Sequence, residues 1–213
     1  MQIVPPCVGR NLYVCYNNLI MQEYTPKILK RTEFGNPILR SKTKRLSKKE
    51  VLSKDIQHLI ADMKYTCDKR KYGVGLAATQ VGVGVAVSVI AIKTAPSRLE
   101  VIPFDRVIIN PEILDHKGRQ VGMWEGCISF SSLNAPVFAK AVRWPEVKVS
   151  YLDDNGKKHE EWLSGLAAHV FQHETDHCNG VLFVDRVKDS STWMNASEYK
   201  KMRKSQRELG SKK

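Results

Sequence analysis

The sequence contains no apolar run that approaches the ~20 residues needed for a membrane-spanning helix. Its longest apolar stretch, from Val81 to Ile92, is rich in valine and interrupted by glycines, which predicts one or two buried strands. The five cysteines are odd in number and widely spaced, so they do not form a disulfide framework. We therefore expect no membrane insertion and a reducing compartment.

Acidic residues are outnumbered by basic ones, and the formal net charge is +12. The basic excess is concentrated between Thr25 and Lys54 and again from Lys188 to the end. Such segments form either a solvated basic face or a surface for an anionic partner such as ribosomal RNA. Residues 1–32 contain Glu23 as their only acid and lack the apolar core of a secretory signal. We interpret them as an N-terminal extension, compatible with organellar targeting.

No internal repeat or linker divides the rest of the chain, which predicts one α+β domain over residues 33–187 and a basic helix and tail over 188–213. The capping box that starts at Ser47 predicts a helix ending at Gly73. The remaining patterns predict a short strand at 107–109 stopped by Asn110-Pro111, a hairpin of 147–151 and 158–163, a helix at 165–178, a strand at 181–184 and a helix at 192–208.

The segment from Gln172 to His177 (QHETDH) lies in the predicted helix 165–178. Residues at i and i+4 stand one turn apart on the same helix face, so His173 and His177 can bind one metal ion. Glu174 lies beside the first histidine, where a carboxylate can act as a general base. Two histidines leave positions open for a third ligand and for water, which favours hydrolysis over a structural metal site.

The best candidate for the third ligand is Cys127, which follows Gly126 in a predicted turn. A thiolate is a tight ligand whose negative charge partly neutralises the ion. A neighbouring glycine would let the backbone approach the metal closely. Cysteine, two histidines and water would complete a tetrahedral site with one exchangeable position.

Three segments of the chain resemble, in order, the signature motifs of the peptide deformylases. They are residues 73–80 (GVGLAATQ), residues 125–129 (EGCIS) and the QHETDH segment. The resemblance covers roughly residues 35–187. It implies an α+β fold in which antiparallel strands pack around a central metal-binding helix. It also implies removal of the N-formyl group from nascent polypeptides that begin with formyl-methionine.

The resemblance assigns roles to individual residues. It implies one divalent cation, natively Fe(II), with zinc, nickel or cobalt able to occupy the site, and the ligands are Cys127, His173 and His177. Glu174 is then the general base. The side-chain amide of Gln80 and the backbone N–H of Ile128 are in position to stabilise the developing oxyanion.

The substrate-binding residues follow from the same resemblance. Gly75 would allow the substrate backbone to approach, and Glu125 would orient a loop or a ligand. His169 either lines the pocket or forms a hydrogen bond in the core. Residues 130–142 depart from the family pattern and predict a longer loop beside the cleft. The methionine side chain would lie in an apolar pocket with candidate walls Val74, Met123, Leu166 and Val170.

Two other functions compete with this interpretation. The first is a metalloprotease that uses Glu198, 21 residues after His177, as its third ligand. The second is a non-catalytic basic module that binds the ribosome or RNA. Formylated initiation occurs in bacteria and in organelles, and the acid-poor extension favours the mitochondrial matrix over the cytoplasm as the location of this chain.

Overall fold

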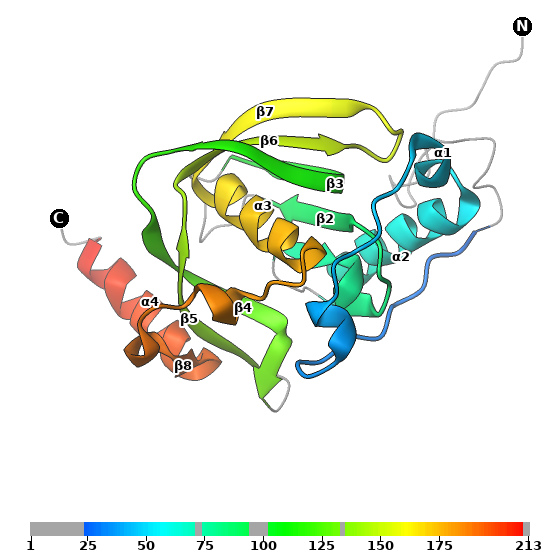
Figure 1. The fold of residues 1–213 in the computed structure, drawn as a ribbon. Helices are drawn as coiled ribbons and strands as arrows, with labels where there is room; N and C mark the ends of the chain where they lie inside the picture. The colour runs from blue at the N-terminus through cyan, green and yellow to red at the C-terminus, as the bar shows by residue number, and fades with distance from the viewer. Residues whose placement is uncertain (1–23, 71–73, 94–101, 133–134, 211–213) are drawn as a thin grey trace, which may run out of the picture.

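The computed structural model describes residues 24–70, 74–93, 102–132 and 135–210. Two antiparallel sheets enclose a central helix (Figure 1). The large sheet has the strand order β1-β2-β3-β6-β7, with the bounds Gly75–Ala77, Val87–Ile92, Phe104–Lys117, Glu146–Leu152 and Lys158–Ser164. The small sheet has the order β4-β5-β8, with the bounds Val121–Ser132, Ala135–Arg143 and Met194–Asn195. This arrangement confirms the predicted fold class.

Helix α3 lies on the concave side of the large sheet, α1 and α2 lie at one end of the molecule, and α4 lies at the other (Figure 1). In the described part of the chain, the α-helices are α1 Lys48–Val51, α2 Lys54–Arg70, α3 Gly165–Cys178 and α4 Ala196–Gly210. Short 3-10 turns lie at η1 Pro37–Arg40, η2 Ala78–Val81, η3 Phe183–Arg186 and η4 Ser190–Thr192. Among the described residues, no helix is long and apolar enough to cross a membrane.

Helix α3 has the bounds that the sequence predicts, and it packs between the two sheets. Phe171 and Ala168 are fully buried against Ile90, Ile108 and Val149 of the large sheet. The burial of these apolar side chains anchors the helix, since each fully buried side chain of this size contributes about 1.5–3 kcal/mol. The helix is therefore a rigid platform for any side chain on its opposite face.

The helix predicted from Ser47 to Gly73 is interrupted, and Gly73 itself lies outside the described residues. The capping box is present, but α1 ends at Val51. The hydroxyl of Ser53 donates to the carbonyl of Glu50 at 2.6 Å, and the Gln57 amide donates to the carbonyl of Val51 at 2.8 Å. Because these side chains satisfy the carbonyls that would continue the helix, the chain breaks and restarts as α2.

The strand predicted at 107–109 does not stop at Asn110. Strand β3 continues to Lys117 through a register shift, and Asn110 adopts φ 53°. The Asn110 side chain exchanges two hydrogen bonds with the backbone of Leu46, at 2.8 and 2.7 Å. These bonds stabilise a left-handed residue inside a strand, because asparagine tolerates that conformation better than most residues.

Two other element predictions are wrong. Residues 130–142, predicted as a loop, belong mainly to the paired strands β4 and β5. Residues 181–184 lead into the 3-10 turn η3, because the carboxylate of Asp185 accepts a hydrogen bond from the backbone N–H of Leu182 at 2.8 Å. The predicted C-terminal helix is present, but it begins at Ala196, after β8.

Part of the predicted N-terminal extension packs on α2. The hydroxyl of Tyr24 donates to Asp62 at 2.8 Å, and the backbone N–H of Lys27 donates to the same carboxylate at 2.7 Å. Further along, the backbone N–H of Thr32 donates to the carbonyl of Gln80 at 2.8 Å. Residues 24–32 thus contact α2 and the 3-10 turn η2, which contains Gln80.

Candidate metal centre

Cys127 lies in strand β4, not in the predicted turn. Alternation along the strand buries Glu125, Cys127 and Ser129 on its inner face. Gly126 is required by packing, because a Cβ atom there would lie 2.7 Å from the ring of Phe138. The pairing of β4 with β5 is irregular between Gly126 and Ser131. The ligand candidate therefore lies beside a local break in the ladder.

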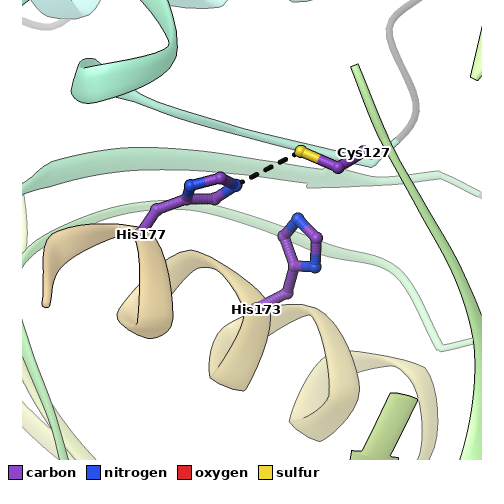
Figure 2. Close-up of side chains that lie close together, drawn as sticks. All are labelled: Cys127, His173 and His177. Carbon is purple, nitrogen blue, oxygen red and sulfur yellow. Dashed lines mark hydrogen bonds between the residues drawn. The ribbon is translucent and has the colours of Figure 1, made fainter. Parts of the chain in front are cut away.

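The structure brings Cys127, His173 and His177 together, as the sequence predicts. One ligand atom from each lies within 4.8 Å of the others. The two imidazoles project from successive turns of α3 toward the cysteine of β4, and the Cys127 Sγ lies 3.4 Å from His177 Nε2 (Figure 2). One sulfur and two nitrogens that converge inside the protein form the donor set of a tetrahedral site with a fourth position for an exchangeable group.

The carboxylate of Glu125 orients the first histidine. His173 Nδ1 donates to Glu125 Oε2 at 2.7 Å, which leaves the lone pair of Nε2 facing the cysteine. The guanidinium of Arg143 donates to both Glu125 oxygens, at 2.7 and 3.1 Å. Burial opposes ionisation of Glu125, but His169, His173 and Arg143 hold its pKa well below the ordinary value. Glu125 is thus an anion that fixes a ligand, as the sequence predicts.

The electrostatic environment favours a thiolate. Burial opposes ionisation of Cys127, but the neighbouring His177 and His173 hold its pKa well below the ordinary value. Burial also opposes protonation of His173, whereas its hydrogen bonds to Cys127 and Glu125 hold its pKa well above the ordinary value. A divalent cation would replace the proton shared by these groups, because metal binding requires deprotonated ligands. The residues present therefore fit a metal ion.

Glu174 is buried beside the cluster, and its Oε2 has no hydrogen-bond partner. Burial raises its pKa above the ordinary value, against the opposing effect of His173 and His177. A Cβ atom at residue 75 would lie 2.2 Å from Glu174 Oε1. Residue 75 must therefore be a glycine, because the carboxylate of Glu174 occupies the space that a side chain would need.

The side-chain amide of Gln80 points into the site. Its Oε1 accepts a hydrogen bond from the backbone N–H of Ala77 at 2.9 Å, and its Nε2 lies 3.2 Å from Cys127 Sγ. This orientation presents N–H donors to the cluster. Ile128, the other predicted oxyanion donor, directly follows the cysteine in the irregular stretch of β4.

Three of the predicted pocket residues belong to or pack against one apolar cluster. Val170 belongs to the core cluster under the large sheet, and Val74 and Leu166 pack against it half-buried. Met123 is half-buried on β4, two residues before Glu125 and so on the same face. His169 is buried and donates from Nε2 to Glu125 Oε1 at 2.6 Å. This contact favours the second interpretation of His169, a hydrogen bond in the core.

A network of charges around Asp176 is not predicted from the sequence: Arg143 and Asp176 are buried in it, whereas the side chain of Arg186 is 44% exposed. Arg143, at the end of β5, donates to Asp176 of α3 as well as to Glu125. Arg186 donates two further hydrogen bonds to Asp176, at 2.7 and 3.0 Å. An aspartate on the buried face of a helix requires a cationic partner, and this is the signal that points to such a network. That the cation is Arg143 of β5 could not be predicted without the fold, because the pairing depends on how the strand packs against α3.

The predicted alternative ligand Glu198 lies elsewhere. It is exposed in the first turn of α4 and forms an ion pair with Lys201 at 2.7 Å. It does not belong to the cluster of potential ligands found among the described residues. The geometry therefore disfavours the metalloprotease.

Comparison with known proteins settles the family. Residues 28–193 match the family model described as polypeptide deformylase. The chain belongs to the peptide deformylase family. The peptide deformylase of Aquifex aeolicus is 39% identical over 174 residues, which cover 82% of this chain and 96% of that protein. That of Thermotoga maritima is 40% identical over 155 residues, which cover 72% and 84%.

Solved deformylase structures share the fold. The Met-Ala-Ser-bound class I type b peptide deformylase from Acinetobacter baumannii superposes with a TM-score of 0.69 at 32% identity, covering 76% of this chain and all of that one. The chain is thus a metal-dependent enzyme of the family that removes the N-formyl group from nascent peptides. Both the metalloprotease and the non-catalytic module are disfavoured.

Proposed function

We propose that this chain hydrolyses the formyl group of N-formyl-methionyl peptides with one cation bound by Cys127, His173 and His177. The observation that carries the proposal is the convergence of these three donors beside a buried carboxylate. The A. baumannii relative binds Met-Ala-Ser, the peptide that deformylation of formyl-Met-Ala-Ser would leave. Fe(II) is the proposed native metal, although thiolate and imidazole ligands suit zinc as well.

When bound, the cation supplies Lewis acidity, which polarises the formyl carbonyl and activates water. Glu174 takes the proton from the attacking water and delivers it to the leaving amine as the carbon–nitrogen bond breaks, giving formate and a free N-terminus. Its raised pKa suits both roles, because an acid–base group works best when its pKa lies near the working pH. Gln80 Nε2 and the backbone N–H of Ile128 donate to the oxygen on which charge develops.

The proposed methionine pocket has the walls Val74, Met123, Leu166 and Val170. Three of these residues belong to or pack against one core cluster, and Met123 lies on β4 of the small sheet. An apolar side chain bound there would replace water on the half-buried surfaces of Val74, Met123 and Leu166. Val74 lies directly before Gly75, so the pocket begins next to the catalytic carboxylate.

The test is formate release from formyl-Met-Ala-Ser by the Fe(II)-loaded protein under anaerobic conditions. We expect turnover by the unmodified chain. Glu174→Gln retains the metal and loses turnover, because only the proton acceptor is removed. Cys127→Ala loses metal uptake as well. Glu198→Ala serves as the matched control and behaves as the unmodified chain. Turnover by Cys127→Ala at the unmodified rate would contradict the proposal.

We further propose that helix α4 contacts the ribosome. The supporting feature is the amphipathic form of α4. Ala196, Tyr199 and Met202 lie on its inner face, and its exposed basic residues are Lys200, Lys201, Arg203 and Lys204. Sedimentation with ribosomes should weaken steeply with salt and after charge reversal of these four residues.

We also propose that the protein acts in the mitochondrial matrix, which the acid-poor composition of residues 1–32 favours. Imaging of the tagged full chain in its own cells distinguishes the matrix from the cytoplasm.

A further inference from the structure

We propose that His169 is a positioning residue of the metal centre and acts through Glu125 on the ring of His173. The inference rests on the proposed function, since it requires His173 to bind a cation. Glu125 accepts four hydrogen bonds, two on each oxygen. A carboxylate offers about four acceptor positions, so the set is complete. His169 supplies the second bond to Oε1, and His173 supplies the second bond to Oε2.

The arrangement of the two histidines determines how Glu125 is held. His169 and His173 are four residues apart on α3, so their rings lie on one face of the helix. Each ring contacts a different oxygen of the same carboxylate, at 2.6 and 2.7 Å. Without His169, Arg143 would be the only remaining donor to Oε1. The carboxylate could then rotate toward the guanidinium and weaken the bond that orients His173.

Among the described residues, the ring nitrogens of His169 have one hydrogen-bond partner, the carboxylate of Glu125. Its ring is 5% exposed, and its Nδ1 has no hydrogen-bond partner among the described residues. A buried imidazole costs more to desolvate than an aliphatic side chain of similar volume. The hydrogen bond to Glu125 is the contact that offsets this cost. It also requires a proton on Nε2, because ionised Glu125 can only accept.

The test compares His169→Leu, which removes the donor, with His169→Gln, whose amide nitrogen can replace Nε2. Thr175→Val is the matched control, because it removes a buried hydroxyl that donates to the carbonyl of Phe171 on the same helix at 2.8 Å. Zinc affinity is measured by competition with a chelator. The absorption spectrum of the cobalt-loaded protein reports the geometry of the ligands. Thermal unfolding of the metal-free proteins measures the purely structural cost of each change.

We expect His169→Leu to lose about 10–100-fold in zinc affinity and to change the cobalt spectrum, as alterations around metal ligands typically do. His169→Gln should restore both. Thr175→Val should lower only the unfolding temperature. Equal zinc affinity of His169→Leu and the unmodified chain would overturn the inference, and so would a loss that glutamine fails to rescue. If the unmodified chain bound no zinc, the proposed function would fail as well.

A second measurement uses the unmodified protein, so its result does not depend on whether a variant folds. Nitrogen-15 spectra of the imidazole rings in the unmodified protein show which ring nitrogens carry a proton. We expect the proton of His169 on Nε2, protected from exchange by the bond to Glu125. A bare Nε2 with the proton on Nδ1 would contradict the inference.

Discussion

The side-chain amide of Gln80 is held at both ends. Its oxygen accepts from the backbone of Ala77, and its nitrogen faces the sulfur of Cys127. This anchoring fixes the direction of the N–H donors before any substrate arrives. A preorganised donor of this kind stabilises the transition state more than the ground state, because the charge develops only as the carbonyl becomes tetrahedral.

Replacing Gln80 by leucine should therefore act on turnover. We expect kcat to fall about 10²–10³-fold, the range typical for removal of one oxyanion donor. The KM for formyl-Met-Ala-Ser should change little, because the lost bond forms mainly in the transition state. Steady-state kinetics at matched metal content measure both. A rise in KM with unchanged kcat would assign Gln80 to ground-state binding instead.

At the scale of elements, the segment before η1 is fastened to α2 by hydrogen bonds to Asp62, which is buried. Burial, together with Asp62, raises the pKa of Tyr24 from 10.0 to about 12. A folded pKa above the unfolded value means that the hydrogen bond stabilises the fold fully below pH 10.0 and is lost as the pH rises toward about 12.

Tyr24→Phe should make stability insensitive to this titration. At neutral pH we expect a loss of about 1 kcal/mol, the net contribution of a typical hydrogen bond, because the site is partly exposed. Urea unfolding from pH 7 upward should show the two proteins converging above pH 10.0. A difference that stayed constant across this range would show that the aromatic ring, and not its hydroxyl, anchors the segment.

At the scale of the whole molecule, buried charges join the small sheet to the central helix. Arg143 of β5 lies between Glu125 of β4 and Asp176 of α3, and Arg186 of η3 completes the series. Arg143 is 2% exposed, so its charge is compensated almost entirely by these two carboxylates. Removal of Arg143 takes the buried cation away from both of them, in a medium that solvates charges poorly. Asp176 then keeps only Arg186, and Glu125 keeps only His169 and His173.

Arg143→Met should lower the free energy of unfolding of the metal-free protein by about 3–5 kcal/mol at pH 7. Because the folded pKa of Glu125 lies below its ordinary 4.5, this carboxylate stabilises the fold above that pH and ceases to do so as the pH falls. The cost of the substitution should therefore shrink below pH 4.5, where protonation of Glu125 removes the charge that Arg143 compensates. Denaturant titrations between pH 7 and acid conditions test this, and a cost independent of pH would contradict it.

The sequence predicts features that depend on neighbouring residues better than features that depend on contacts between distant segments. Helix α3 and the pair His173 and His177 follow from the spacing along one helix face, and the capping box of Ser47 depends on residues three apart. Strands β4 and β5 are not predicted because small residues, glycines and serines in β4 and alanines in β5, obscure the alternation of buried residues. The kink at Asn110 depends on a backbone 64 residues away, at Leu46. Such contacts become visible only when the chain is folded.

The stacked rings of the C-terminal region have a practical consequence for protein production. Tyr199 lies parallel to Phe138 at 4.0 Å, and Phe138 in turn covers Gly126, next to the cysteine ligand. The family match ends at residue 193, before this tyrosine. A shortened version designed on the family boundary would therefore expose the aromatic face of Phe138 beside the strand that carries Cys127, so recombinant versions should retain the chain through α4.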